Sequence, residues 1–274
     1  MRSWKDNVRF VLVEPRESGN VGASARAMKN MGFRNLCLVN PASALNDEAK
    51  WFARHAVDVL ESACVCETVA GAVSGASLVV GATRRKGRRR GVFMNADAGG
   101  RRLFSIARHN KVAILFGRED RGLFNLEVEE CGFLVTIPAS REQPSLNLSQ
   151  AVMIVAYELR KAERERGARE YGHRGSTEES ETPESGRECP DGATAGAGRA
   201  GELLVTHAEL SALYARMAEV LRLLEYLPRG NRDLENKMMA NIKHLIGRAG
   251  LTGWELKMLH GICSRIEKKC SETE

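Results

Sequence analysis

The chain has 274 residues, of which 43% are hydrophobic and 28% charged, and its formal net charge is +6. These values are typical of a globular protein with a substantial core, and they exclude a disordered or fibrous chain. No stretch is long and apolar enough to span a bilayer, and the N-terminal residues lack the apolar core of a signal peptide. We therefore expect a cytoplasmic protein without membrane partners.

The first 165 residues alternate short apolar runs with helical patterns. The expected strands are 8–13, 35–39, 77–82, 111–116 and 133–137. The expected helices are 20–31, 47–60, 67–74, 97–108, 126–131 and 147–165. Continuous Val/Ile/Leu strands separated by helices predict an α/β fold, with a parallel sheet covered by helices on both faces. In the first helix we expect Asn20 as the N-cap and Gly32 just beyond the C-terminus.

A basic run crosses the loop after the third expected strand. Six of the seven residues from Arg84 to Arg90 are Arg or Lys. A solvated loop and a polyanion-binding loop explain this run about equally well, because clustered cations release counterions from phosphates.

The composition changes between residues 167 and 201, where Gly, Ser, Thr, Ala and Glu dominate and large aliphatic residues are almost absent. Such a stretch cannot bury enough apolar surface to offset the entropy of ordering, so we expect a flexible linker. We therefore divide the chain into a first domain at 1–166, this linker, and a C-terminal domain at 202–274.

The C-terminal domain is expected to hold three amphipathic helices. Thr206–Glu209 and Thr252–Glu255 have the form of capping boxes, and each precedes apolar residues at helical spacing. Cations in these helices could face RNA, although charge that merely keeps a packing module soluble is at least as good an explanation.

Seven cysteines are scattered along the chain. Their number is odd and no C-x-x-C pair occurs, so the sequence suggests neither a zinc site nor a disulfide framework. Small buried thiols in a reducing compartment explain them better, and we expect no metal.

Four segments at strand ends or helix starts carry residues suited to a ligand site. Asn20–Arg26 follows the first strand, Gly81–Arg84 ends the third, Gly117–Gly122 follows the fourth, and Ser145–Asn147 opens a helix. Each segment alone is weak evidence for a ligand site, since Arg26 could be an ordinary surface arginine and Ser145 or Asn147 could be a simple helix cap. Open parallel sheets, however, bind small molecules at the carboxyl ends of their strands, where these segments meet.

Three of these segments resemble the motifs of the SpoU-type members of the SPOUT methyltransferase superfamily. The matching stretches are Asn20–Met28, Leu115–Leu123, and Ile137–Ala139 together with Ser145–Ser149. The order and spacing of three motifs over residues 7–165 make the resemblance highly specific. Within the superfamily the chain is most similar to enzymes that methylate a ribose 2′-oxygen at position 32 of the tRNA anticodon loop.

The resemblance implies a deep trefoil knot in the C-terminal part of the α/β fold, a homodimer, and S-adenosylmethionine as cofactor. By motif position, the residues implied to bind the cofactor are Thr83, Arg84, Gly117, Ile137, Ser145, Leu146 and Asn147. Those implied to act in catalysis are Asn20, Arg26, Glu119, Ser145 and Asn147. We expect RNA contacts from Arg26, Arg85, Lys86, Arg88, Arg89 and Arg90.

Arg26 is the base that the family's proposed mechanism implies. A guanidinium group stays protonated far above neutral pH, so we instead expect Arg26 to hold the target phosphate and to stabilise the developing alkoxide.

Two further kinds of function remain open from the sequence. The chain could methylate another tRNA or rRNA position, or it could bind RNA through the same fold without catalysis. A dinucleotide-binding oxidoreductase lacks support, because no G-x-G-x-x-G follows the first strand.

Overall fold

The computed structural model describes residues 3–42, 46–85, 91–174, 201–226 and 232–272. Seven strands in these residues form one parallel sheet in the order β3-β2-β1-β6-β4-β7-β5. The strands are β1 Val8–Val13, β2 Leu36–Val39, β3 Cys64–Cys66, β4 Leu78–Ala82, β5 Phe93–Asn95, β6 Val112–Phe116 and β7 Phe133–Thr136.

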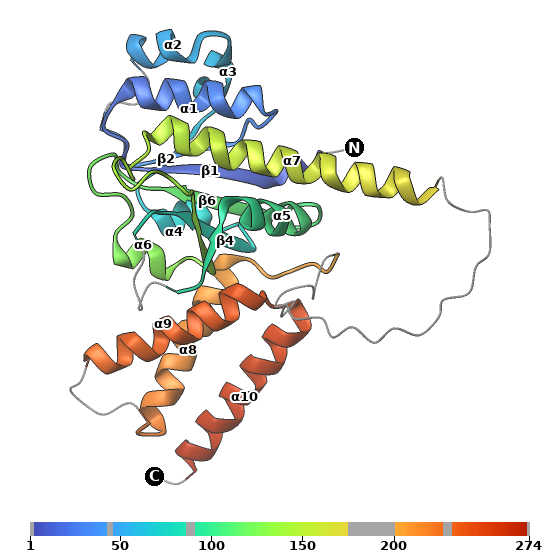
Figure 1. Ribbon diagram of the computed structural model, residues 1–274. Coiled ribbons are helices and arrows are strands. Elements are labelled where there is room, and N and C mark those ends of the chain that lie inside the picture. Colours follow the sequence, from blue (N-terminus) through green and yellow to red (C-terminus); the bar gives the residue numbers. More distant parts are fainter. Residues whose placement is uncertain (1–2, 43–45, 86–90, 175–200, 227–231, 273–274) are drawn as a thin grey trace.

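Helices cover both faces of this sheet, as the sequence predicted (Figure 1). The helices of the sheet region are η1 Trp4–Asn7, α1 Ser18–Asn30, α2 Asp47–Ala53, η2 Arg54–Ala56, α3 Val57–Glu61, α4 Val69–Val73, α5 Ala96–Ala107, α6 Asn125–Glu129 and α7 Leu148–Arg174. One face packs against α1, α5 and α7, and the other against α4 and α6. Alternation along β1 explains the division, since Phe10 and Leu12 face the first layer while Val11 and Val13 face the second.

The five expected strands are all present, and two short strands were missed. β3 lies at one edge of the sheet with Val65 exposed, and β5 lies at the other edge. Edge strands of three residues have too few buried side chains to give an apolar run. The single helix expected over 47–60 is divided into α2, η2 and α3 at Arg54, whose φ is +54°.

The expected boundaries of the first helix are right at one end only. Gly32 has a φ of +85° directly after α1, which suits glycine and ends the helix as predicted. The N-cap prediction is wrong, because α1 begins at Ser18 and its N-cap is Glu17. Asn20 therefore lies inside the first turn, where its side chain is free to bond outside the helix.

Helix α7 continues to Arg174, beyond the expected end of the first domain at residue 166. Most of the expected linker lies outside the described residues. The chain resumes in three helices, α8 His207–Leu223, α9 Arg232–Ala249 and α10 Gly253–Ser271. The capping boxes at Thr206 and Thr252 are confirmed.

The three C-terminal helices share a small core and pack against the sheet region. Leu213 and Leu251 are central to that core, and Figure 1 shows the helices grouped on the side of the sheet away from α1 and α2. Glu130, which follows α6, accepts bonds from His207 (2.8 Å) and Lys243 (3.1 Å) at this contact. The backbones of Gly132 and Gly247 also meet there so closely that a Cβ on Gly132 would lie 2.3 Å from the Gly247 oxygen.

Candidate active site

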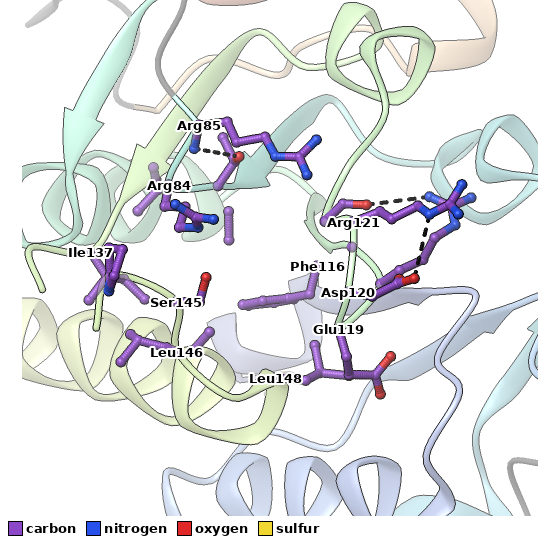
Figure 2. Close-up of a pocket in the computed structure, with 18 residues that line it drawn as sticks. Arg84, Arg85, Phe116, Glu119, Asp120, Arg121, Ile137, Ser145, Leu146 and Leu148 are labelled. Atoms are coloured by element: carbon purple, nitrogen blue, oxygen red, sulfur yellow. Dashed lines mark hydrogen bonds and ion pairs between the residues drawn. The ribbon is translucent and has the colours of Figure 1, made fainter. Parts of the chain in front are cut away.

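A pocket of about 800 Å³, including its open mouth, lies at the carboxyl ends of β4, β6 and β7 (Figure 2). Its walls come from four separate stretches, namely Ala82–Arg85, Phe116–Gly122, Val135 with Ile137, and Pro144–Leu146 with Leu148 and Ala151. Three of the four segments singled out from the sequence thus contribute to one cavity.

The turn after β6 closes so tightly that it requires glycine at its first position. A Cβ on Gly117 would lie 2.2 Å from both the Gly122 carbonyl carbon and the Leu123 nitrogen. Gly122 has a φ of +63°, and its N–H donates to the Arg118 carbonyl (2.8 Å). The two glycines therefore fold residues 118–121 back over the pocket.

Arg118 holds this turn from inside the protein. Only 5% of the residue is exposed, and its guanidinium pairs with Glu14 (2.6 Å) and Glu127 (2.9 Å). The group also stacks 3.9 Å from the ring centroid of Phe124. The bond from Arg118 lowers the pKa of the Glu14 carboxyl group. Arg118 thus fixes β1, the turn and α6 to one another.

A series of side-chain hydrogen bonds joins three of the residues predicted for catalysis. The Asn147 amide donates to Asn20 Oδ1 (2.7 Å), and the Asn20 amide donates to Glu119 Oε1 (3.1 Å). Glu119 also accepts from the backbone N–H of Arg16 (3.2 Å) and of Glu17 (3.4 Å). The network connects the turn after β6 to the starts of α1 and α7.

Glu119 is the member of this network that lines the pocket. Asn20 and Asn147 lie in a neighbouring groove over the start of α1, which they share with Glu17, Glu48 and Phe52. Asn147 was predicted to bind the cofactor, but it lies outside the pocket lining. Its Oδ1 accepts bonds from the Ser149 N–H and hydroxyl and caps α7.

The other predicted cofactor residues line the pocket together. They are Thr83, Arg84, Gly117, Ile137, Ser145 and Leu146. Figure 2 shows the Ser145 hydroxyl in the space between Ile137 and Phe116, with Arg84 and Arg85 on the opposite side from Leu146 and Leu148. Arg85, predicted only as an RNA contact, belongs to the same wall.

Arg26 lies apart from this pocket. It is exposed on α1 and lines a shallow groove between α1 and α7, together with Phe52, Leu146, Met153 and Ile154. Leu146 borders both cavities, so the groove and the pocket are neighbours. Lys86, Arg88, Arg89 and Arg90 lie outside the described residues.

Sequence reasoning missed several residues of the pocket wall. Phe116, Asp120, Arg121, Pro144 and Leu148 line it without having been predicted. Asp120 pairs with Arg16 (2.9 Å) and Arg121 (3.5 Å). The signal was present for Asp120 and Arg121, because both lie within the Gly117–Gly122 turn. Phe116 and Leu148 lie within the motif stretches Leu115–Leu123 and Ser145–Ser149, but neither was given a role of its own.

Comparison with known proteins supports the same segments. The model of the SpoU rRNA Methylase family matches residues 7–157, more than half of the chain.

The chain belongs to the SpoU rRNA methylase family.

Curated relatives match the SpoU domain and the C-terminal helices together. The chain is 34% identical to the tRNA (cytidine/uridine-2′-O-)-methyltransferase TrmJ of Yersinia enterocolitica, over 96% of this chain and 92% of the relative. It is 33% identical to the tRNA (cytidine/uridine/adenosine-2′-O-)-methyltransferase TrmJ of Pseudomonas aeruginosa, over 96% and 95%. The crystal structure of TrmJ from Z. mobilis ZM4 superposes with a TM-score of 0.73 at 27% identity, covering 94% of this chain and 98% of that one.

Among the described residues of this SpoU family member, no helix is both long and apolar enough to cross a membrane.

Proposed function

We propose that this protein transfers the methyl group of S-adenosylmethionine to a ribose 2′-oxygen of tRNA. The observation that carries the proposal is the convergence of the three motif segments on one site, with the pocket bordered by the bond network from Glu119 through Asn20 to Asn147. Relatives named as tRNA 2′-O-methyltransferases, matched over nearly the whole chain, support the same substrate class. We also propose that the protein acts in the cytoplasm, where a tRNA substrate of this kind is available.

The residues of the pocket fit S-adenosylmethionine. Phe116, Val135, Ile137 and Leu146 form apolar walls suited to an adenine ring, and the close backbone turns allow main-chain groups to reach its edge. Arg84 and Arg85 suit the cofactor carboxylate, and the carboxylates of Glu119 and Asp120 suit its cationic centres. When bound, the cofactor supplies an electrophilic methyl group.

The side chains around the pocket then position the nucleophile. Alignment of the ribose oxygen with the methyl group supplies much of the acceleration in such a displacement. Arg26 clamps the phosphate next to the target ribose and stabilises the developing alkoxide, and phosphate or water accepts the proton.

Arg26→Lys keeps the charge but loses the bidentate fork, so we expect turnover to fall about 100-fold. Near-normal turnover of this variant would count against the role.

We also propose a homodimer, which would account for the separation of Arg26 from the pocket. The groove between α1 and α7 is lined by Met153 and Ile154, and Tyr157 on α7 is 52% exposed. We propose that this face packs on its copy, so that Arg26 of one protomer serves the pocket of the other.

Sedimentation equilibrium tests the dimer. Tyr157→Asp should be monomeric, whereas the control Tyr226→Asp, at an exposed tyrosine after α8, should remain dimeric. A monomeric parent chain would contradict it.

We also propose that residues 117–147 and the start of α7 form the trefoil knot of the SPOUT fold. The support is the wall shared by the 117–122 turn and residues 144–148, together with membership of the SpoU family.

The experiment uses labelled S-adenosylmethionine and bulk tRNA that lacks modifications. We expect label in the tRNA, and mapping should place the 2′-O-methyl group at position 32 of the anticodon loop. Label at another tRNA position, or in rRNA only, would change the substrate within the same class. No incorporation into any RNA, with cofactor binding intact, would leave a non-catalytic RNA-binding protein.

A further inference from the structure

Three cysteines from two neighbouring strands meet at the edge of the sheet. Cys37 lies on β2, and Cys64 and Cys66 lie on the edge strand β3. The parallel register pairs Cys37 with Cys64 and Val39 with Cys66. Because alternate residues of a strand point to the same face, all three thiols lie on one side of the sheet. Cys37 and Cys66 belong to the layer that packs against α4.

The sulfur atoms are grouped at distances suited to a shared ligand. Cys37 Sγ lies 3.7 Å from Cys66 Sγ, and Cys64 Sγ also lies 3.7 Å from Cys66 Sγ. All three sulfurs lie within 4.8 Å of one another. Tetrahedral zinc–thiolate bonds of ~2.3 Å place neighbouring sulfurs about 3.8 Å apart. Two of the three separations therefore already match those of a metal–thiolate site.

The cluster has an inner and an outer side. Cys37 is fully buried, Cys66 is partly buried, and Cys64 is exposed. Within the described part of the chain, the group contains these three ligands and no histidine or carboxylate. An ion held by the three sulfurs would therefore keep a fourth position toward solvent, on the side of Cys64.

We propose that Cys37, Cys64 and Cys66 bind one soft d¹⁰ metal ion such as Zn²⁺. Three thiols lose their protons to solvent, and three metal–sulfur bonds form with water at the remaining position. Purely sulfur ligands select such ions over Mg²⁺ or Ca²⁺. The ion would tie the three-residue strand β3 to the buried strand β2. The site is independent of the methyl-transfer pocket.

A disulfide is the other chemistry open to neighbouring thiols. Cys66 Sγ lies 3.7 Å from both Cys37 Sγ and Cys64 Sγ, so either pair could be joined. A disulfide would use two of the three thiols and leave the third unpaired. One ion engages all three sulfurs at once, so the metal is the favoured occupant.

The test is a titration of the reduced, full-length protein with Cd²⁺, followed by the ultraviolet sulfur-to-cadmium charge-transfer absorption. We expect one tight site per chain. Cys64→Ser removes an exposed ligand without opening the core. It should weaken Cd²⁺ binding by more than about 100-fold, because losing a residue that only supports a metal ligand costs up to about 100-fold. Cys270→Ser, which changes a cysteine outside the cluster, should bind like the parent chain. Excess Zn²⁺ should displace the Cd²⁺ signal.

Two results would overturn the proposal. One is the absence of a charge-transfer band, or a band that Cys64→Ser and Cys270→Ser weaken equally. The other is a protein that, without added oxidant, is isolated with Cys37 and Cys66 joined, shown by mass spectrometry of the alkylated chain. If Cys64→Ser unfolds, Cys66→Ala tested at matched circular dichroism decides the question. None of these readouts depends on methyl transfer.

Discussion

At the scale of single residues, two arginines of the site region have opposite environments. Arg118 is buried between Glu14 and Glu127, whereas Arg26 is exposed on α1. The sequence pattern singled out Arg26 by its motif, and it gave no special role to Arg118. Burial and ion pairing depend on the fold, because Glu14 is 104 residues from its partner.

Arg118→Met should destabilise the protein strongly. The substitution leaves the Glu127 carboxylate, whose side chain is 11% exposed, without its cation. Breaking a buried pair in this way costs about 3–5 kcal/mol. Urea unfolding followed by circular dichroism measures the loss. Arg34→Met is the matched control: Arg34 is 65% exposed and pairs with Asp58, so its loss should cost less than about 1 kcal/mol. Equal effects of the two variants would contradict the role given to Arg118.

At the scale of elements, the apolar runs predicted the central strands well. β1, β4 and β6 are buried along their length and have the Val/Ile/Leu composition typical of strands covered on both faces. The order of the strands was not predictable, because β6 inserts between β1 and β4 through contacts distant in the sequence. For the same reason the bonds from Asn147 to Asn20 and on to Glu119 emerged only from the fold.

The turn after β6 depends on the absence of a side chain at Gly117. In Gly117→Ala the added methyl group would meet the Gly122 and Leu123 backbone, and neither can move without opening the turn. We expect a loss of stability of about 1–3 kcal/mol and loss of S-adenosylmethionine binding by calorimetry. Gly261→Ala on α10, where nothing lies within 4 Å, should bind normally and gain up to about 1 kcal/mol. Normal cofactor binding by Gly117→Ala would refute the dependence.

At the scale of the whole molecule, one carboxylate connects the C-terminal helices to the sheet region. Glu130 accepts from His207 on α8 and from Lys243 on α9. The hydrogen bond from His207, together with the charge and hydrogen bond of Lys243, lowers the pKa of Glu130 from 4.5 to about 2, despite the opposing effect of burial. The sequence predicted a separate helical module, but this contact could not be predicted from charges scattered over distant segments.

The pKa of Glu130 predicts a loss of stability in acid. The pKa of Glu130 is lower in the folded protein than in the unfolded chain. Its ionised carboxylate therefore contributes fully to the free energy of unfolding above about pH 4.5, and this contribution is lost as the pH falls toward 2. Between pH 5 and pH 2, the free energy of unfolding measured with denaturant should fall by about 3 kcal/mol more in the parent chain than in Glu130→Gln. Glu61→Gln, an exposed control, should follow the parent chain. The same acid dependence in Glu130→Gln would contradict the assignment.

Two tRNA transcripts that differ only at nucleotide 32 decide whether the ribose 2′-oxygen there is the methyl acceptor. One carries the ordinary ribose and the other a 2′-deoxyribose, and both are incubated with the protein and labelled S-adenosylmethionine. We expect methylation of the first transcript and none of the second, because only the first offers the attacking oxygen. Equal labelling of the two transcripts would contradict it.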